Sequence, residues 1–261
     1  MKLDNIEIKN CINEFVKKGY VIRDIQNTES LNWINKEYKK IIKQFLHVKN
    51  INDDQKIFNQ IHTHVKLKDL NKFRLSVFNE INKKKFFKNH YYNIAKEYLD
   101  ILVGNELAIQ SRINLSIQFP NDKSSLLPLH ADTWSGVSPY EIVVWLPLVD
   151  CYQTKSMYFY DITKMKYFNK VFKNKTFSTS KIFNQIKKNI KWLNIKFGQI
   201  LIFDQSIPHG NVINKERETR WSMNCRFKGI FTPYADKRLG EFFEPISIKP
   251  VSIKALKYKH P

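Results

Sequence analysis

The segment RWSMNCRF at residues 220–227 alternates strictly between polar and apolar side chains. The polar series is Arg220, Ser222, Asn224 and Arg226, and the apolar series is Trp221, Met223, Cys225 and Phe227. Successive side chains of a β-strand point to opposite faces, so this period of two predicts a strand with one apolar and one polar face. We therefore expect a sheet that buries the tryptophan side and presents the arginine side.

A second segment, SRINLSIQF at 111–119, repeats this pattern, and its polar series is Arg112, Asn114, Ser116 and Gln118. An ordinary sheet with its polar face in water would alternate in the same way, and that alternative stays open. However, the chain has 37 lysines and only 7 arginines, whereas these two polar faces contain three arginines and no lysine. This choice of residues favours the inside of a polar pocket over a solvated face.

The remaining periodicity divides the chain into a helical first part and a β-rich second part. Apolar runs predict buried strands at 140–148 and 199–205, and a short strand at 19–25. Up to residue 104 the chain otherwise has helical spacing, with expected helices at 10–19, at 30–46 with Ser30 as N-cap, and at 83–104 ending near Gly104. Neither an internal repeat nor a flexible linker interrupts the sequence, which predicts one domain over 1–261.

Composition narrows the classes of function. The net charge of +20 comes mainly from lysines spread along the chain, whereas nucleic-acid binders often concentrate arginine; this argues against nucleic acid as partner but favours an anionic substrate. The longest apolar stretch, 142–149, is too short to cross a bilayer, and residues 1–10 lack an apolar signal core. Three scattered cysteines fit a reducing compartment. We expect a cytoplasmic protein without membrane insertion.

Two histidines and an aspartate are the candidate metal ligands. In LPLHADTW (127–134), His130 and Asp132 would point the same way on an extended segment. Such a triplet is weak evidence alone, since roughly 0.3 are expected by chance. A third ligand is available in GQILIFDQSIPHGN (198–211), where His209 follows a predicted buried strand at a turn. Two histidines and one carboxylate form the facial triad of non-haem Fe(II) oxygenases.

Arg220 and Ser222 lie shortly after His209 and on one strand face. A co-substrate that chelates iron at one end and carries a carboxylate at the other would need such an anchor, because arginine offers a planar fork to carboxylates and serine adds a donor. The alternative is a surface salt bridge from Arg220 to Glu216 or Glu218.

These motifs together resemble a known family. HAD at 130–132, His209, and RWS at 220–222 look like the HxD…H…RxS signature of iron(II)- and 2-oxoglutarate-dependent oxygenases. The flanking segments 15–25, 143–150 and 197–222 resemble the phytanoyl-CoA-hydroxylase-like branch. Within it the chain, including its tail 237–254, looks closest to the bacterial enzymes encoded with carbohydrate-biosynthesis genes. Segment 151–177 departs from that branch, which often has a glycine-rich stretch there, so the substrates of relatives do not transfer.

The resemblance implies a mainly β fold with flanking helices. The expected architecture is a double-stranded β-helix, a cupin-like jelly roll, with an N-terminal helical buttress. Within the single domain we expect mostly helical support over 1–104, a jelly-roll core over 105–231 and a C-terminal extension over 232–261. The segment 163–192 is expected as an insertion, either a helical hairpin with a solvated lysine face or a lid over the pocket.

The resemblance also implies the roles of individual residues. Fe(II) would be bound by His130, Asp132 and His209, and the far carboxylate of 2-oxoglutarate by Arg220 and Ser222. Further residues on the predicted inner face are candidates for the cofactor site (Asn114, Gln118, Asn224) and for the substrate site (Arg112, Arg226, Trp134, Asn211). Arg112 or Arg226 would hold a second anion, and Asn211 would fix the turn that presents His209. O2 would be consumed, with succinate and CO2 as co-products.

The leading hypothesis is therefore a dioxygenase that hydroxylates or otherwise oxidises a small anionic metabolite. A sugar or nucleotide sugar of surface-polysaccharide biosynthesis is the favoured substrate. Two alternatives remain at this stage: a jelly-roll sugar-binding protein or isomerase without oxidative chemistry, and an oxygenase that acts on nucleic acid or peptide. The sequence leaves the oligomeric state open, with a homodimer as one option.

Overall fold

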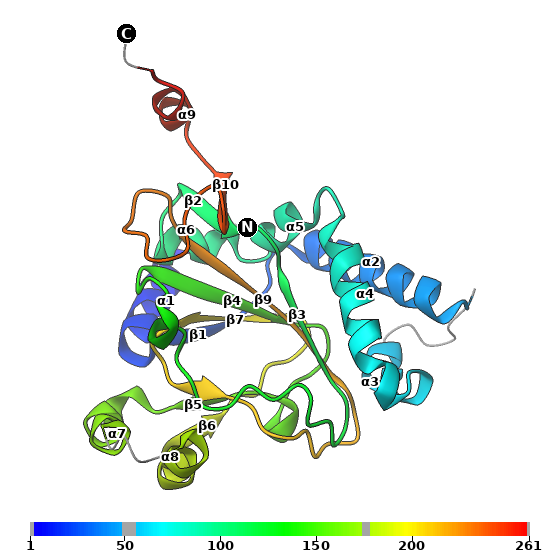
Figure 1. Cartoon of the computed structure of the whole chain (residues 1–261). Helices are drawn as coiled ribbons and strands as arrows, with labels where there is room; N and C mark the ends of the chain where they lie inside the picture. Colours follow the sequence, from blue (N-terminus) through cyan, green and yellow to red (C-terminus); the bar gives the residue numbers. More distant parts are fainter. Residues whose placement is uncertain (1–2, 49–55, 174–177, 260–261) are drawn as a thin grey trace.

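The computed structural model describes residues 3–48, 56–173 and 178–259, and it consists of two antiparallel sheets with helices around them (Figure 1). In the large sheet the strand order is β1 (Tyr20–Asp24), β7 (Gln199–Asp204), β4 (Glu141–Pro147), β9 (Arg220–Gly229), β2 (Leu107–Gln110) and β10 (Phe243–Ser247), and β3 (Asn114–Gln118) also pairs with β9. In the small sheet the order is β6 (Ile190–Trp192), β5 (Tyr158–Tyr160) and β8 (His209–Gly210). The expected jelly-roll class is confirmed.

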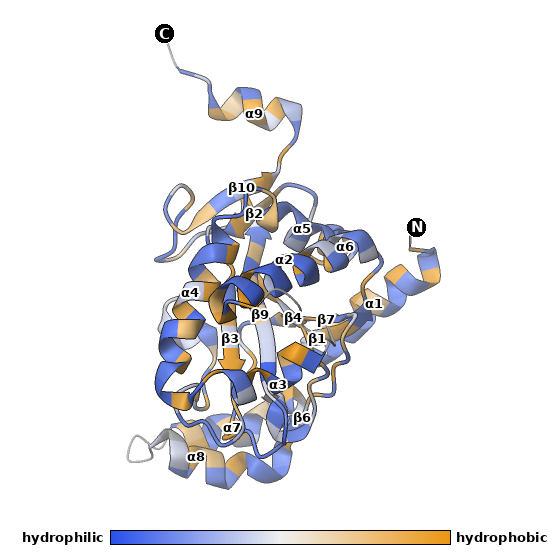
Figure 2. Cartoon of the chain, turned by 90° about the vertical axis from the view of Figure 1, so that its right-hand side faces the viewer, coloured by the Kyte–Doolittle hydropathy of each residue, from blue (hydrophilic) through white to orange (hydrophobic). Residues whose placement is uncertain are grey.

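Most helices of the described part lie before the second strand of the chain, with β1 between α1 and α2, and they cover the outer face of the large sheet (Figure 1). They are α1 (Asn5–Lys18), α2 (Thr28–Leu46), α3 (Lys56–His64), α4 (Leu70–Asn82), α5 (Phe87–Asn93) and α6 (Lys96–Leu102). Later in the chain come α7 (Met165–Phe172), α8 (Thr179–Ile186) and α9 (Pro250–Leu256). Apolar and polar residues alternate around α2 and α4 (Figure 2), so each of these helices buries one stripe against the sheet and leaves the other in water.

The two alternating segments pair with each other as β3 and β9. Their register places Asn114 opposite Asn224, Ser116 opposite Ser222, and Gln118 opposite Arg220. Opposite residues of an antiparallel pair point to the same face, so the polar series of both strands meet on the face toward the small sheet. The apolar series meets the helices, where the buried Trp221 ring contacts Tyr38, Phe58 and Phe73 edge-on at centroid distances of 6.2, 5.2 and 5.8 Å.

Two helix predictions are corrected. Ser30 does not cap its helix: α2 starts at Thr28, and the side chain of Asn27 accepts the hydrogen bond from the Ser30 backbone N–H at 2.9 Å. The expected single helix over 83–104 is two helices that meet at residues 94–95. The break lets the chain turn, so that α5 contacts α2 and β10 while α6 contacts α1. One straight helix could not reach both sets of neighbours.

The segment 163–192 contains two short helices, but it ends in a strand. Residues 174–177 between α7 and α8 lie outside the described part of the chain. Phe168 and Val171 of α7 form a separate apolar cluster with Ile182 and Ile186 of α8 and with residues of the small sheet. The last residues pair with β5 as strand β6, so the expected insertion is joined to the small sheet instead of standing outside it.

Each of the three cysteines is buried as a free thiol. Cys151 and Cys225 lie within the β-rich part and Cys11 lies on α1. Burial raises the pKa of the Cys151 thiol to about 12.

In the described ranges, the helices lack the combination of length and apolar character that spanning a bilayer requires.

Replacing Trp221 by alanine should destabilise the fold strongly. The indole is fully buried between the large sheet and three helices, so its removal leaves a cavity that costs about 3–5 kcal/mol of unfolding free energy. Urea unfolding followed by far-UV circular dichroism measures this. The matched control is Phe231→Ala, because Phe231 is exposed and its loss should change stability by less than about 0.5 kcal/mol. Equal stability of the two variants would refute this account of the helix–sheet packing.

Candidate active site

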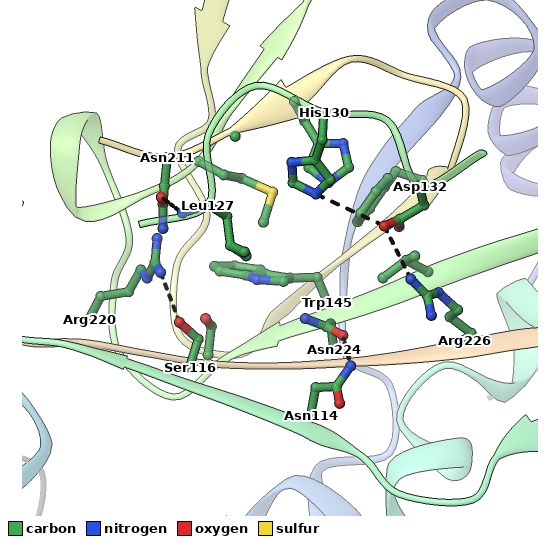
Figure 3. A pocket seen from close by; sticks show the side chains of 16 residues that line it. Asn114, Ser116, Leu127, His130, Asp132, Trp145, Asn211, Arg220, Asn224 and Arg226 are labelled. Carbon is green, nitrogen blue, oxygen red and sulfur yellow. Dashed lines mark hydrogen bonds and ion pairs between the residues drawn. The ribbon is translucent and has the colours of Figure 1, made fainter. Parts of the chain in front are cut away.

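A cavity of about 210 Å³ lies between the two sheets. The small sheet and the segment before it supply His130, Asp132 and His209, while β3 and β9 supply Ser116, Asn114 and the polar series of residues 220–226. Trp145 of β4 lies between these two groups, with the imidazoles on one side and Arg220 and Ser116 on the other (Figure 3). The cavity is therefore lined by residues far apart in sequence.

His130, Asp132 and His209 can hold one metal ion. One ligand atom from each of them lies within 4.8 Å of the other two. The Nδ1 atom of His130 lies 2.7 Å from the Pro128 carbonyl oxygen, and that of His209 lies 2.8 Å from the Ile207 carbonyl oxygen. A carbonyl oxygen only accepts, so each Nδ1 carries the proton and each Nε2 keeps its lone pair for a metal. Two imidazoles and a carboxylate suit iron, zinc or a similar divalent ion.

The backbone brings the two histidines together. The N–H of His130 donates to the carbonyl of His209 at 2.9 Å, and the N–H of His209 donates to the carbonyl of His130 at 2.7 Å. Their ring centroids are consequently 4.3 Å apart. Burial, followed by the neighbouring His130, lowers the pKa of His209 to about 4, so its imidazole is neutral near pH 7, the form that binds metals.

Gly210 allows the close approach of the segment that carries His130. A Cβ atom at this position would lie 2.9 Å from the Leu127 carbonyl oxygen and 2.6 Å from the Tyr158 hydroxyl oxygen. Real Cβ atoms essentially never come so close to other atoms, so a larger residue here would push the backbone of residues 127–130 away.

A hydrogen-bonded chain holds Asp132. Arg226 Nη2 lies 3.1 Å from Asp132 Oδ1, and Arg226 Nε donates to Gln205 Oε1 at 2.9 Å. Gln205 Nε2 in turn donates to Glu141 Oε2 at 3.0 Å. Arg226, expected on the substrate, is therefore bound to a candidate metal ligand, because the register of β9 brings it beside Asp132. The roles of Gln205 and Glu141 were not predicted from the sequence. The available signal was Glu141, a carboxylate at the start of the otherwise apolar strand β4.

Arg220 is a buried cation without a carboxylate partner. Its side chain is 3% exposed, Nη2 donates to Ser116 Oγ at 2.9 Å, and buried Nε has no acceptor. Burial lowers the pKa of the guanidinium to about 10. The two carboxylates considered as alternatives are engaged elsewhere: Glu216 accepts from Thr154 and Glu218 from Lys155. Across the described ranges no ion pair to Arg220 is formed.

An unpaired buried charge is costly, so the position of Arg220 has a chemical consequence. Leaving a charge buried without a counter-ion costs several kcal/mol in proteins. Ser222 lines the same cavity beside Arg220 and is 1% exposed. An anion that enters the cavity can pair with the Arg220 guanidinium and accept hydrogen bonds from the hydroxyl groups of Ser116 and Ser222. The geometry thus provides a metal position and an anion position in one cavity.

Of four further candidate residues, three line this cavity and one lies outside its lining. Asn114 and Asn224 line it and form a hydrogen bond with each other at 2.9 Å. Gln118 is buried and donates to the Val212 carbonyl at 2.8 Å, outside the cavity lining. Asn211 accepts from the Leu127 N–H at 2.7 Å. It therefore ties the segment that leads to His130 to the chain that directly follows His209, and its expected role in fixing the turn of His209 stays a prediction.

Two substrate candidates are placed outside the cavity lining. Arg112 donates to Asn79 Oδ1 at 2.6 Å and lies over the Phe78 ring at 4.4 Å, because β3 begins at Asn114 and the expected alternation does not extend back to residue 112. Trp134 lies in the 3₁₀ turn η2 (Asp132–Ser135) and packs on Phe168 and Phe172 of α7. Both side chains therefore lie outside the lining of the central cavity.

Comparison with known proteins identifies the fold. No family model and no curated protein sequence matches the chain. Among solved structures, AviO1 from Streptomyces viridochromogenes Tue57 is similar with a TM-score of 0.56 and 11% identity, over 89% of this chain and 100% of that one. HygX from Streptomyces hygroscopicus, with nickel and 2-oxoglutarate bound, gives 0.52 and 9% identity over 88% and 90%.

A third similar structure is the epimerase SnoN in complex with Fe3+, alpha ketoglutarate and nogalamycin RO. It matches with a TM-score of 0.51 and 11% identity, over 88% of this chain and 87% of that one. At such low identity these likenesses establish the fold, and function has to be argued from the cavity itself.

Replacing His209 by alanine should weaken metal binding by about 100-fold or more, because it removes one of three ligands. Calorimetric titration with Co2+ measures the affinity. His64→Ala is the matched control, since His64 lies exposed on α3 and its loss should leave the affinity unchanged. Equal affinity of the two variants would show that the metal binds elsewhere.

Gly210→Ala should lower the Co2+ affinity by about tenfold, the size typical of changes next to metal ligands. The added Cβ would displace the backbone of residue 127 and, with it, His130. Adding Tyr158→Phe removes one of the two clashing atoms and should restore part of the affinity. An unchanged affinity in Gly210→Ala would mean that the close approach of these segments does not position the ligands.

Proposed function

We propose that this protein is an iron(II)- and 2-oxoglutarate-dependent oxygenase. The observation that carries the proposal is the buried Arg220, which lacks a carboxylate partner and lies in the same cavity as the His130–Asp132–His209 cluster. 2-Oxoglutarate has two ends that match these two positions. Its 2-oxo acid end chelates a metal, and its far carboxylate suits a guanidinium fork.

The residues present fit both the metal and the co-substrate. Both imidazoles direct an unprotonated Nε2 into the cavity, and Asp132 adds the carboxylate of a facial triad. At the other end, the Nε atom of Arg220 is without an acceptor, and the hydroxyls of Ser116 and Ser222 line the same space. The similar folds of HygX and SnoN, which bind 2-oxoglutarate with a metal, support this proposal.

Each residue has a distinct role in the proposed mechanism. Iron and 2-oxoglutarate, when bound, supply the oxidation of a substrate C–H bond by O2 with release of succinate and CO2. Arg220 fixes the far carboxylate of the co-substrate, which orients its other end. Arg226 would hold the Asp132 carboxylate in place beside the two imidazoles through the contact between its Nη2 atom and Asp132 Oδ1. Trp145 and Phe203 line the cavity with apolar surface and exclude water.

The proposed substrate is a small molecule of the carbohydrate type, as the sequence resemblance implies. The proposed reaction is hydroxylation of this molecule. We also propose that the whole chain forms one domain. The alternative of a sugar-binding jelly roll without redox chemistry is less well supported, because such a protein has no use for a buried unpaired guanidinium beside a metal site. The net charge of +20 favours encounter with substrates that carry an anionic group elsewhere in the molecule.

Anaerobic addition of Fe(II) and 2-oxoglutarate should produce a weak visible charge-transfer band. Arg220→Ala should raise the 2-oxoglutarate concentration needed for the band by about 100-fold, since it removes a buried charge pair worth a few kcal/mol. Arg112→Ala is the matched control, because Arg112 lies on the α4 side outside the cavity. No band in the unsubstituted protein, or an equal effect of both variants, would exclude the proposed function.

A further inference from the structure

Aromatic rings close one open side of the space between the two sheets. On the β1 side, the rings of Tyr20 and Phe159 are 5.2 Å apart, and those of Phe159 and Phe203 are 5.0 Å apart. Phe159 and Phe203 also contact the His209 ring, at 5.7 and 5.2 Å. These contacts fill the region between β1 and β5. A molecule of substrate size therefore has to reach the metal position from another direction.

The opposite side, along β3, carries a groove of about 480 Å³. Helix α4, strand β3 and the segment 124–127 form its walls. The groove shares four lining residues with the central cavity: Asn114, Ser116, Leu127 and Asn224. The two spaces therefore adjoin along the hydrogen-bonded Asn114–Asn224 pair, and this pair forms the boundary between groove and cavity.

The groove has no free charge among its lining residues. Its one ionisable side chain is Arg74, whose Nε donates to the Ile117 carbonyl at 2.8 Å and whose Nη1 donates to Ser124 Oγ at 2.9 Å. The remaining Nη2 is paired at 2.5 Å with Asp122, which is fully buried. Arg74 thus has its donors occupied and its charge balanced. It shapes the wall and does not offer a binding site for an anion.

The other lining residues are amides, hydroxyls and apolar side chains. The polar ones are Asn71, Asn114, Ser116, Ser124, Ser125 and Asn224, and the apolar ones include Leu75, Phe78, Leu115 and Leu126. Ser124 and Ser125 donate their hydroxyl hydrogens to Asp122 and keep oxygen lone pairs. Asn114 and Asn224 share one hydrogen bond and keep further N–H groups and lone pairs, so this wall can still donate to and accept from the hydroxyl groups of a ligand. Leucine and phenylalanine provide surface for its C–H face.

We propose that this groove binds the substrate and that the bound part is an uncharged, polyhydroxylated ring with one apolar face, such as a sugar ring. The inference rests on the proposed function for the oxidation itself. The ring lies between α4 and segment 124–127, and its reactive carbon reaches the metal position past Asn114 and Asn224. Any anionic group of the substrate lies outside the groove.

Calorimetry on the metal-free protein tests this proposal without relying on turnover. The probes are methyl and phenyl glycosides of glucose, galactose and rhamnose, and the phosphates of the same sugars. We expect at least one neutral glycoside to bind, with the phenyl glycosides tighter than the methyl ones. Binding of the phosphates alone, or of none of the probes, would overturn the assignment of an uncharged ligand.

A groove-filling variant locates the binding. Leu75 is 53% exposed and lines the groove, so Leu75→Trp fills it without disturbing the core and should weaken glycoside binding about tenfold or more. Leu67→Trp is the matched control, since Leu67 is 61% exposed and is not part of the lining. Thermal unfolding confirms that both variants fold. Equal glycoside affinity in the two variants would refute the groove as the binding site.

The charge-transfer measurement separates failure of this inference from failure of the proposed function. If the band forms but no glycoside binds, the oxygenase assignment stands and the groove assignment is wrong. If a glycoside binds in the groove but no band forms, the protein binds carbohydrate without the proposed oxidation, and the groove assignment stands as a binding site alone.

Discussion

Two backbone hydrogen bonds between His130 and His209 are the constraint on which the site depends. They join residues that are 79 positions apart in sequence into a single antiparallel bridge. Because the backbones are paired, the two imidazoles lie side by side. Each Nδ1 is then bound to a carbonyl two residues earlier in its own segment, so the preorganisation of the ligands is built from local backbone geometry.

Each of the two sheets supplies a different part of the site. The small sheet and the segment leading into it present the candidate metal ligands, whereas the large sheet presents Arg220, Ser222 and Arg226 from the single strand β9. The site is therefore complete only when the sheets face each other at the correct distance. Trp221, which lies between Arg220 and Ser222 in sequence, anchors the opposite face of that strand in the helical layer. Adjacent residues of β9 therefore serve the two purposes: Trp221 packs in the core, and Arg220 and Ser222 line the anion position.

Sequence patterns predicted which faces the residues occupy more reliably than which partners they have. The alternation in 220–227 correctly brought Arg220, Ser222 and Asn224 to one face, because a period of two is a local property of a strand. Arg226 lies on that face as well, but its partner is Asp132, which depends on the offset between two distant segments. Arg112 lies outside the cavity lining, because strand β3 begins at Asn114, two residues later than the pattern suggested. The break between α5 and α6 follows from contacts with α2, β10 and α1, which no local pattern encodes.

The burial of all three thiols has a consequence for a protein that would handle dioxygen at a reactive metal. Oxidative damage to cysteine begins at the thiolate and needs contact with the oxidant. Cys11, Cys151 and Cys225 are inaccessible, and burial raises the pKa of each thiol above its usual range, so each stays protonated. If the proposed function holds, an oxidant formed in the cavity would meet only buried, protonated thiols, and these are poor targets for oxidation.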